Sequence, residues 1–202
     1  MDDAFNNGEQ QQIRDAVKNK YQKVSQSAEG LFRYQTGKSG AVALGYDGTI
    51  LDEIPEGALK SFCGVGNPFS VEVIKEQSSV LDIGCGAGFD LLVASRIVGP
   101  GGRVCGIDLT EEMARKAQSL ISEFGNQTIT VQKVSGESLP YDQDSFDYVI
   151  SNGVFNLSPC KLKLFREIRR VLRPGGYLQF ADIVLTQDPP PGVADSLDDW
   201  SQ

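Results

Sequence analysis

The sequence predicts an α/β fold with a doubly wound, mainly parallel sheet and a helical cap at its N-terminus. Short apolar segments alternate with longer amphipathic ones from residue 79 onward, and a glycine-rich turn joins the first strand to its helix. Strands that alternate with helices imply parallel pairing through right-handed crossovers. The expected strands are 79–83, 103–107, 128–134, 146–151 and 177–184, and the expected helices are 89–98, 111–124 and 161–172.

The residues before the sheet predict a cap. Between Gln10 and Gly30, apolar side chains recur every three or four positions, as in an amphipathic helix. The glycine-rich stretch 37–48 predicts a loop or short helix, and the prolines and glycines of 55–68 predict turns. We expect residues 30–70 to form a lid over a ligand rather than a separate domain. After the last helix, residues 173–176 read Arg-Pro-Gly-Gly, which predicts a helix stop and a turn.

The most informative segment is 80–88, where a buried strand enters the turn Gly84-Cys85-Gly86-Ala87-Gly88. Glycines allow the backbone to approach a ligand where a Cβ would clash. The next strand ends at Asp108, whose carboxylate is placed to accept hydrogen bonds from a ribose diol. A ligand with a ribose is therefore expected at this turn.

Two residues argue against a dinucleotide. Phe89 stands where the pattern G-x-G-x-x-G requires its third glycine, and the carboxylate of Asp82 would lie badly beside a pyrophosphate. A ligand with positive charge and no phosphate fits better, and S-adenosylmethionine is such a ligand. A nicotinamide oxidoreductase is the alternative that these two residues weaken.

Other polar segments end strands at the same edge of the sheet, where ligands of such folds bind. They are 135–137 after the third strand and 151–153 after the fourth. Thr110 is expected to cap the following helix, which would leave Asp108 for the ribose, with Leu109 against the adenine. The expected cofactor-binding residues are Asp82, Gly84, Cys85, Gly86, Gly88, Asp108, Leu109, Gly136, Glu137, Ser151 and Asn152.

Each of these features also has a purely structural interpretation. The glycines can make a tight turn without a ligand, and Asp108 can cap a helix. Residues 135–137 can form a polar turn before Pro140, and residues 151–153 can simply end a strand.

Composition narrows the possible partners. The formal net charge of −8 leaves the chain without the basic footprint of a nucleic-acid binder, and it disfavours a membrane surface. No apolar run reaches the roughly 18 residues of a membrane span, and the acidic N-terminus lacks the layout of a signal peptide. We expect a cytoplasmic protein.

Histidine is absent, and the four cysteines form no C-x-x-C pair. No metal site is therefore expected, and the commonest general base is missing. Cys105 is expected in the core and Cys85 in a structural role, whereas Cys160 is expected on the surface near a helix start.

Five segments together resemble class I S-adenosylmethionine-dependent methyltransferases: 81–88, 106–110, 136–140, 146–152 and 171–176. Within that superfamily the sequence most resembles arsenite methyltransferases, through 66–68, 86–90, 156–159 and 181–184. The resemblance implies a Rossmann-like sheet of order 3-2-1-4-5, and methyl transfer to a small-molecule acceptor. It divides the chain into an N-terminal helical segment and lid (1–70) and a cofactor-binding domain (71–202), which we expect to form one structural unit.

The departures from the arsenite family concern its thiols. Val65 stands where the family motif Y-G-C-G-N-P has its cysteine, and Cys63 stands in the tyrosine position. Gly153 replaces the cysteine of the family's S-N-C, and the chain ends at Trp200-Ser201-Gln202, before the third family cysteine. Cys63 and Asn152 are the remaining candidates for a catalytic role.

Several functions stay open. Transfer to a lone pair on sulfur or arsenic needs no general base, which suits a chain without histidine. Arsenite methylation would then use Cys63 with thiols from glutathione or a partner chain. Alternatively, the chain is a non-catalytic S-adenosylmethionine-binding module or a truncated methyltransferase fragment, because the family's two final strands are not visible. The fifth strand would then be an open edge, which a homodimer would cover.

Overall fold

The computed structural model describes residues 5–125, 128–184 and 186. Its described residues form one sheet of five parallel strands, in the order β3-β2-β1-β4-β5. The predicted fold class and strand order are therefore confirmed. The strands are β1 (Ser79–Ile83), β2 (Arg103–Asp108), β3 (Ile129–Lys133), β4 (Phe146–Asn152) and β5 (Leu172–Ala181).

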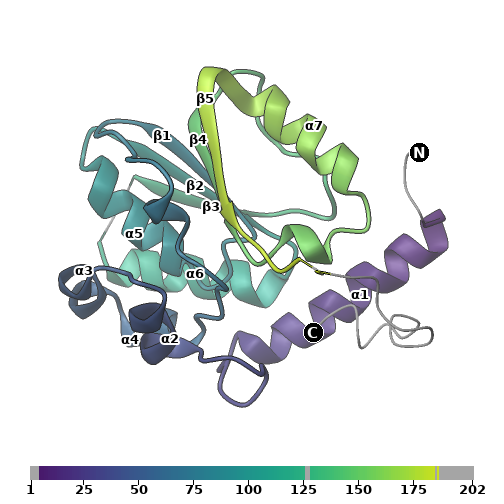
Figure 1. Cartoon of the computed structure of the whole chain (residues 1–202), viewed down its shortest axis with the longest axis horizontal. Coiled ribbons are helices and arrows are strands. Elements are labelled where there is room, and N and C mark those ends of the chain that lie inside the picture. Colours follow the sequence, from purple (N-terminus) through teal and green to yellow (C-terminus); the bar gives the residue numbers. More distant parts are fainter. Residues whose placement is uncertain (1–4, 126–127, 185, 187–202) are drawn as a thin grey trace.

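Helices cover both faces of this sheet (Figure 1). One face carries α5 (Phe89–Val98) and α6 (Glu111–Glu123), and the other carries α7 (Lys161–Val171). Alternate side chains of each strand point to opposite faces, so Val80 joins the α5 and α6 side of the core and Leu81 joins the α7 side. Burial on both faces explains the continuous apolar runs of β1 and β4.

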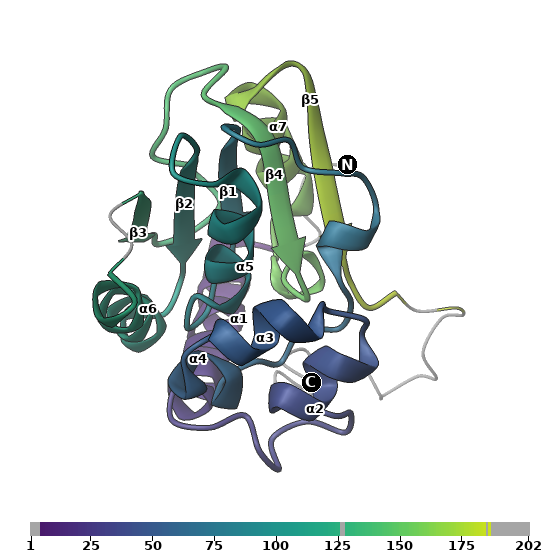
Figure 2. The ribbon, with the colours of Figure 1, turned by 90° about the vertical axis from the view of Figure 1, so that its left-hand side faces the viewer.

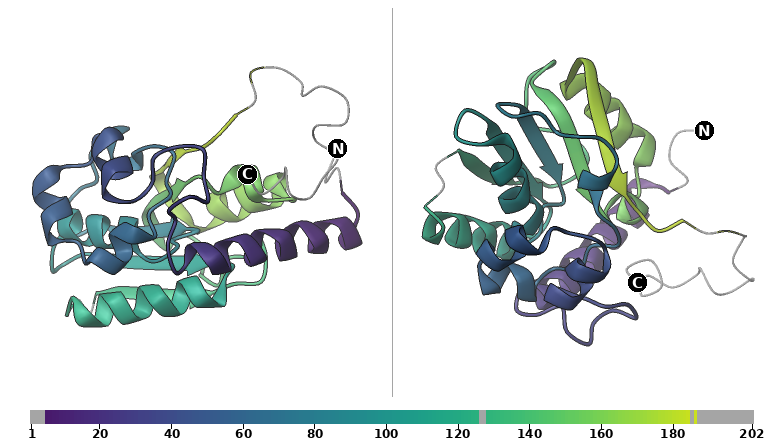
Figure 3. Two further views of the ribbon diagram at one scale, coloured as in Figure 1. Left: turned by 90° about the horizontal axis from the view of Figure 1, so that it is seen from below. Right: turned by 60° about the vertical axis from the view of Figure 1, so that its left-hand side comes forward.

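The N-terminal helices lie at the end of the sheet toward which the strand arrows point (Figure 2). They are α1 (Asn7–Val24), α2 (Gly37–Ala43), α3 (Gly48–Glu53) and α4 (Glu56–Lys60); two short 3₁₀ turns, η1 (Pro68–Ser70) and η2 (Phe155–Leu157), complete the described elements. Figure 3 shows α1 running beside α6, and Lys116 of α6 donates hydrogen bonds to Ser25 O and Ser61 Oγ. One buried hydrophobic cluster joins the N-terminal helical segment to the sheet and its helices, and it includes Val24, Phe62 and Leu91.

The bounds of two predicted elements differ from the observed ones by more than one residue. The first helix begins at Asn7 because Asn6 and Glu9 form a reciprocal capping box, and it ends at Val24 rather than near Gly30. The last strand begins at Leu172 and ends at Ala181, not at Val184. The predicted turn at 173–176 lies inside this strand as an irregularity, because Leu172 already pairs with Phe146 before the register shifts.

No helix in the described residues is both long and apolar enough to cross a lipid bilayer.

Candidate cofactor-binding site

The glycine turn after β1 forms the floor of a pocket. Gly84, Gly86 and Gly88 all have positive φ, at 73°, 52° and 87°. The backbone N–H groups of Gly84 and Cys85 both donate to Ile107 O, at 2.8 and 3.0 Å, which ties the turn to β2. A Cβ on Gly86 would meet no atom within 4 Å, and Gly86 lines the pocket. The backbone at Gly86 is therefore open to a ligand.

Asp108 lies at the end of β2, beside this turn. Its side chain is buried, and its two oxygens accept hydrogen bonds from Gly86 N at 2.9 Å and Thr110 N at 2.7 Å. Thr110 occupies the N-cap position of α6, as expected, but its side chain makes no capping hydrogen bond, and its N–H donates to Asp108 instead. Each carboxylate oxygen keeps a second lone pair, and the residue lines the pocket. Burial raises the pKa of Asp108 above its usual value.

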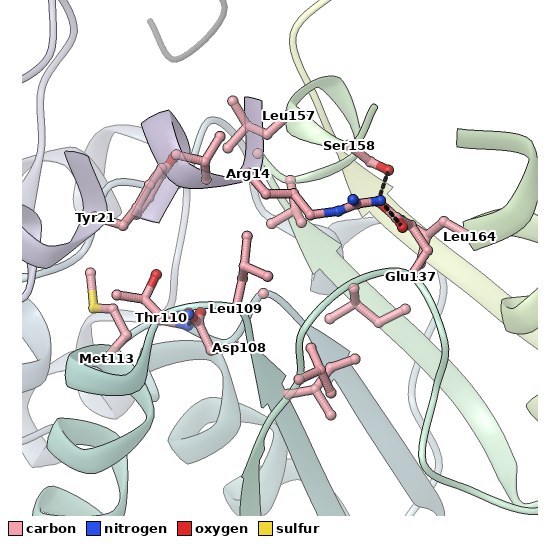
Figure 4. A pocket seen from close by; sticks show the side chains of 18 of the residues that line it. Arg14, Tyr21, Asp108, Leu109, Thr110, Met113, Glu137, Leu157, Ser158 and Leu164 are labelled. Carbon is pink, nitrogen blue, oxygen red and sulfur yellow. Dashed lines mark hydrogen bonds and ion pairs between the residues drawn. The ribbon is translucent and has the colours of Figure 1, made fainter. Parts of the chain in front are cut away.

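The pocket lies at the carboxyl ends of the strands and is closed from above by α1 (Figure 4). Apolar side chains from α1, β2, α6, η2 and the link between β2 and α6 form most of its walls. These include Val17, Ile107, Leu109, Met113 and Leu157. Among the predicted residues, the structure brings Gly84, Gly86, Asp108, Leu109, Gly136, Glu137, Asn152 and Cys63 together in the lining.

The structure does not bring four predicted residues to the pocket lining: Asp82, Cys85, Gly88 and Ser151. Ser151 is 1% exposed and donates its hydroxyl to Ile83 O at 2.9 Å, so it braces β4 against β1. Cys85 is buried beneath the turn, against Gly106. Asp82 is 2% exposed, and its Oδ2 has no hydrogen-bond partner among the described residues. Burial and the nearby Asp90 raise its pKa well above the usual value.

Asn152 links the sheet to the lid segment. Its Oδ1 accepts from Val65 N at 2.8 Å and Gly66 N at 3.2 Å. Its Nδ2 lies within donating distance of Gly66 O, Tyr46 Oη and Asp90 Oδ2, at 2.8, 3.1 and 3.2 Å. Asn152 therefore holds the backbone of Val65 and Gly66 against the end of β4.

The sequence prediction missed the contribution of α1. Arg14, Val17 and Tyr21 of this helix line the pocket, whereas the predicted lid of residues 30–70 supplies Ser61 and Cys63. Arg14 Nη2 pairs with Glu137 Oε2 at 2.7 Å, and Ser158 Oγ donates to Glu137 Oε1 at 3.2 Å. The four-residue spacing of Val17 and Tyr21 predicted an apolar helix face, but the sequence alone did not indicate that this face covers a ligand pocket.

The four cysteines are free thiols. Cys63 lines the pocket, and burial raises its pKa to about 12, with Lys20 opposing the shift. Its thiol is therefore protonated near neutral pH. Cys105 is buried, as expected, but Cys160 is only 3% exposed and lies 3.5 Å from Arg14 Nη2. The prediction of a surface position for Cys160 is wrong, because α1 packs over it.

Comparison with known proteins decides the family. The model of the family described as "Methyltransferase domain" matches residues 74–202. The chain belongs to this methyltransferase family. The resemblance to class I S-adenosylmethionine-dependent methyltransferases, close to the arsenite methyltransferases, is thus confirmed.

Similar proteins fall into more than one group. An arsenite methyltransferase of Halobacterium salinarum is 38% identical over 159 residues, which are 79% of this chain and 40% of that protein. A demethylmenaquinone methyltransferase of Staphylococcus carnosus is 36% identical over 106 residues, which are 51% of this chain and 42% of that protein.

A solved structure, an arsenic(III) S-adenosylmethionine methyltransferase from Chlamydomonas reinhardtii, has a TM-score of 0.61 at 36% identity. That match covers 66% of this chain and 47% of the other. The chain thus spans less than half the length of these relatives.

Proposed function

We propose that this chain binds S-adenosylmethionine in the pocket beneath α1 and acts in methyl transfer to a small-molecule acceptor. The observation that carries the proposal is the open backbone at Gly86 beside the carboxylate of Asp108, at the carboxyl ends of β1 and β2. A glycine cradle next to a ribose-binding carboxylate fits an adenosyl ligand without a pyrophosphate.

The pocket residues divide the binding task. The remaining lone pairs of Asp108 would accept the ribose hydroxyls, and the apolar walls at Leu109 and Leu157 would enclose the adenine. Asn152 and Cys63 also line the pocket, and we place the acceptor beside them.

The chemistry of the lining favours an acceptor that already carries a reactive lone pair. S-adenosylmethionine supplies an activated methyl group, so the protein has mainly to position donor and acceptor. Among the described lining residues, Tyr21 and Cys63 have raised pKa values, Glu137 is paired with Arg14, and Asp108 holds two backbone N–H groups. None of these side chains is a ready general base near neutral pH.

Arsenite is the first acceptor to test, with thiols supplied by glutathione beside Cys63. A quinol-type acceptor is the second, because demethylmenaquinone methyltransferases are among the similar proteins. A module that binds the cofactor without turnover is the alternative from another functional class.

Calorimetric titration with S-adenosylhomocysteine, compared with NAD, tests the binding step. We expect micromolar binding of S-adenosylhomocysteine alone. Asp108→Ala should weaken binding by about 1–3 kcal/mol, because ribose hydrogen bonds to a carboxylate are lost. The exposed Asp52→Ala is the matched control, and thermal unfolding of both variants separates binding from folding. Equal binding of NAD, or an unchanged affinity in Asp108→Ala, contradicts the proposal.

Transfer is tested separately, with radiolabelled S-adenosylmethionine and arsenite plus glutathione. Labelled methylarsenic supports the acceptor, whereas cofactor binding with no labelled product from any offered acceptor favours the non-catalytic module.

A further inference from the structure

The helix α1 is held to the rest of the molecule unevenly along its length. At its C-terminal end and just beyond it, Val24 and Ala28 are buried, and both belong to the hydrophobic cluster that joins the N-terminal helical segment to the sheet. Lys116 of α6 donates to Ser25 O at 2.6 Å and to Ser61 Oγ at 2.7 Å. This end of α1 is therefore fixed to the core.

The N-terminal part of α1, residues 7–19, lies over the pocket instead. Ile13 and Val17 are buried, but neither belongs to the two hydrophobic core clusters of the described residues, and Val17 lines the pocket. An apolar side chain above a cavity lacks packing partners on that side, so it gains fewer dispersion contacts than a side chain in the core. Burial therefore holds this part of the helix less firmly than the C-terminal end.

The side chain of Arg14 ties this part of α1 to the sheet. Its Nη2 pairs with Glu137 Oε2, in the turn after β3, at 2.7 Å and lies 3.5 Å from Cys160 Sγ. The other side chains of residues 7–19 that bond to described residues do so within the helix or to the two residues before it. Within the described part of the chain, this ion pair is thus the polar contact that must break before residues 7–19 can leave the pocket.

We propose that residues 7–19 of α1 form a gate over the pocket, which opens by pivoting on the anchored C-terminal end of the helix. The ion pair between Arg14 and Glu137 is the latch of this gate. Opening admits the cofactor and releases the product, and closing returns Arg14 and Val17 to the pocket wall. The role in cofactor entry rests on the proposed function, whereas the opening itself is a property of the ligand-free chain.

Two cysteines of the chain report on this motion. Cys160 is 3% exposed, and Arg14 of the gate lies against its Sγ, so opening would uncover this thiol while the sheet stays folded. Cys105 lies within β2 and is 2% exposed, so it is uncovered only when the sheet unfolds. A local opening costs less free energy than global unfolding. The two thiols should therefore react at different rates if the gate moves.

The experiment follows the reaction of each cysteine with iodoacetamide in the ligand-free 202-residue chain, by mass spectrometry of its peptides. Each rate is divided by the rate of the same cysteine in the urea-unfolded chain, which removes differences in intrinsic reactivity. On this scale we expect Cys160 to react about 100-fold faster than Cys105. Saturating S-adenosylhomocysteine should slow the reaction of Cys160 about 10-fold or more, because the ligand binds the closed gate.

Two variants test the latch. Glu137→Gln leaves Arg14 over Cys160 but removes the charge that holds it, so Cys160 should react about 10-fold faster in the ligand-free chain. Gln22→Ala is the matched control: it removes a hydrogen bond to Glu112 near the anchored end of α1 and should leave the rate unchanged. Cys105 in the same samples shows whether a faster reaction reflects a loss of folded protein.

The outcomes separate the gate from the proposed function. If Cys160 reacts no faster than Cys105 in the ligand-free chain, α1 does not open by itself and the gate is refuted, whether or not the chain binds a ligand. If Glu137→Gln and Gln22→Ala change the rate of Cys160 equally, the ion pair is not the latch. If S-adenosylhomocysteine does not bind, the proposed function fails, and the ligand-free comparison still decides the gate. If it binds without slowing Cys160, the gate does not control cofactor entry.

Discussion

Alanine substitutions at two glycines of the turn after β1 should have different consequences. Both glycines have positive φ, 73° at Gly84 and 52° at Gly86, so both variants share backbone strain. Their surroundings differ. A Cβ on Gly86 would enter open space in the pocket, whereas a Cβ on Gly84 would collide with the methyl groups of Val154. Gly86→Ala therefore tests ligand approach, and Gly84→Ala tests packing.

The magnitudes follow from these surroundings. A left-handed conformation costs a non-glycine residue about 1–2 kcal/mol, so Gly86→Ala should lower the free energy of unfolding by about that amount. Overpacking adds about 1–3 kcal/mol at Gly84, which makes a total of about 2–5 kcal/mol for Gly84→Ala. Because the new methyl group of Gly86→Ala occupies ligand space, its affinity for S-adenosylhomocysteine should fall about tenfold or more, or roughly 1.4 kcal/mol.

Urea unfolding and calorimetric titration measure both quantities on the same samples. If Gly86→Ala binds S-adenosylhomocysteine as tightly as the unsubstituted chain, the ligand does not approach this backbone and the cradle interpretation is refuted. If Gly84→Ala is no less stable than Gly86→Ala, the argument from the Val154 contact is refuted.

Three further predictions concern the lid and the buried acids. Asn152→Ala should lower the free energy of unfolding by about 1–3 kcal/mol, because the half-buried N–H groups of Val65 and Gly66 lose their acceptor. The exposed Gln143→Ala, measured by the same thermal unfolding, should change little. Cys63, with its pKa raised from 9.0 to about 12, should react with iodoacetamide at pH 8 about 1000-fold more slowly than an ordinary thiol, as followed by mass spectrometry of the folded chain. Alkylation at the rate of glutathione would contradict the raised pKa, since the side chain itself is only half-buried. Burial raises the pKa of Asp90 from 3.8 to about 6. The protonated side chain therefore stabilises the fold at low pH, and about 3 kcal/mol of that stabilisation is lost as the pH rises from about 4 to 6. Asp90→Asn should flatten the plot of unfolding free energy against pH over that interval, and an unchanged slope would show that Asp90 is not the group responsible.

The sequence predicted the elements whose causes are local. Apolar alternation and turn chemistry located all five strands, and helix α5 was predicted with its observed bounds, 89–98. The glycine turn and Asp108 were recognised because a parallel sheet brings the carboxyl ends of its strands to one edge. The prediction of an element's bounds was wrong where the same residues are compatible with two local structures. The residues 173–176, Arg-Pro-Gly-Gly, predicted a turn between a helix and a strand, but strand pairing with Phe146 had already begun at Leu172.

The sequence by itself determined the family, the strand–helix alternation and the glycine turn after β1, because each depends on short-range spacing and on glycine backbone freedom. Only the tertiary structure decided which side chains share the pocket. Arg14 meets Glu137, and Asn152 meets Val65, because α1 and the lid pack over the ends of the strands. The direction of each strand side chain decided that Ser151 braces β1 while Asn152 reaches the pocket. These contacts join segments far apart in the chain, and their geometry depends on how whole elements pack rather than on any local pattern.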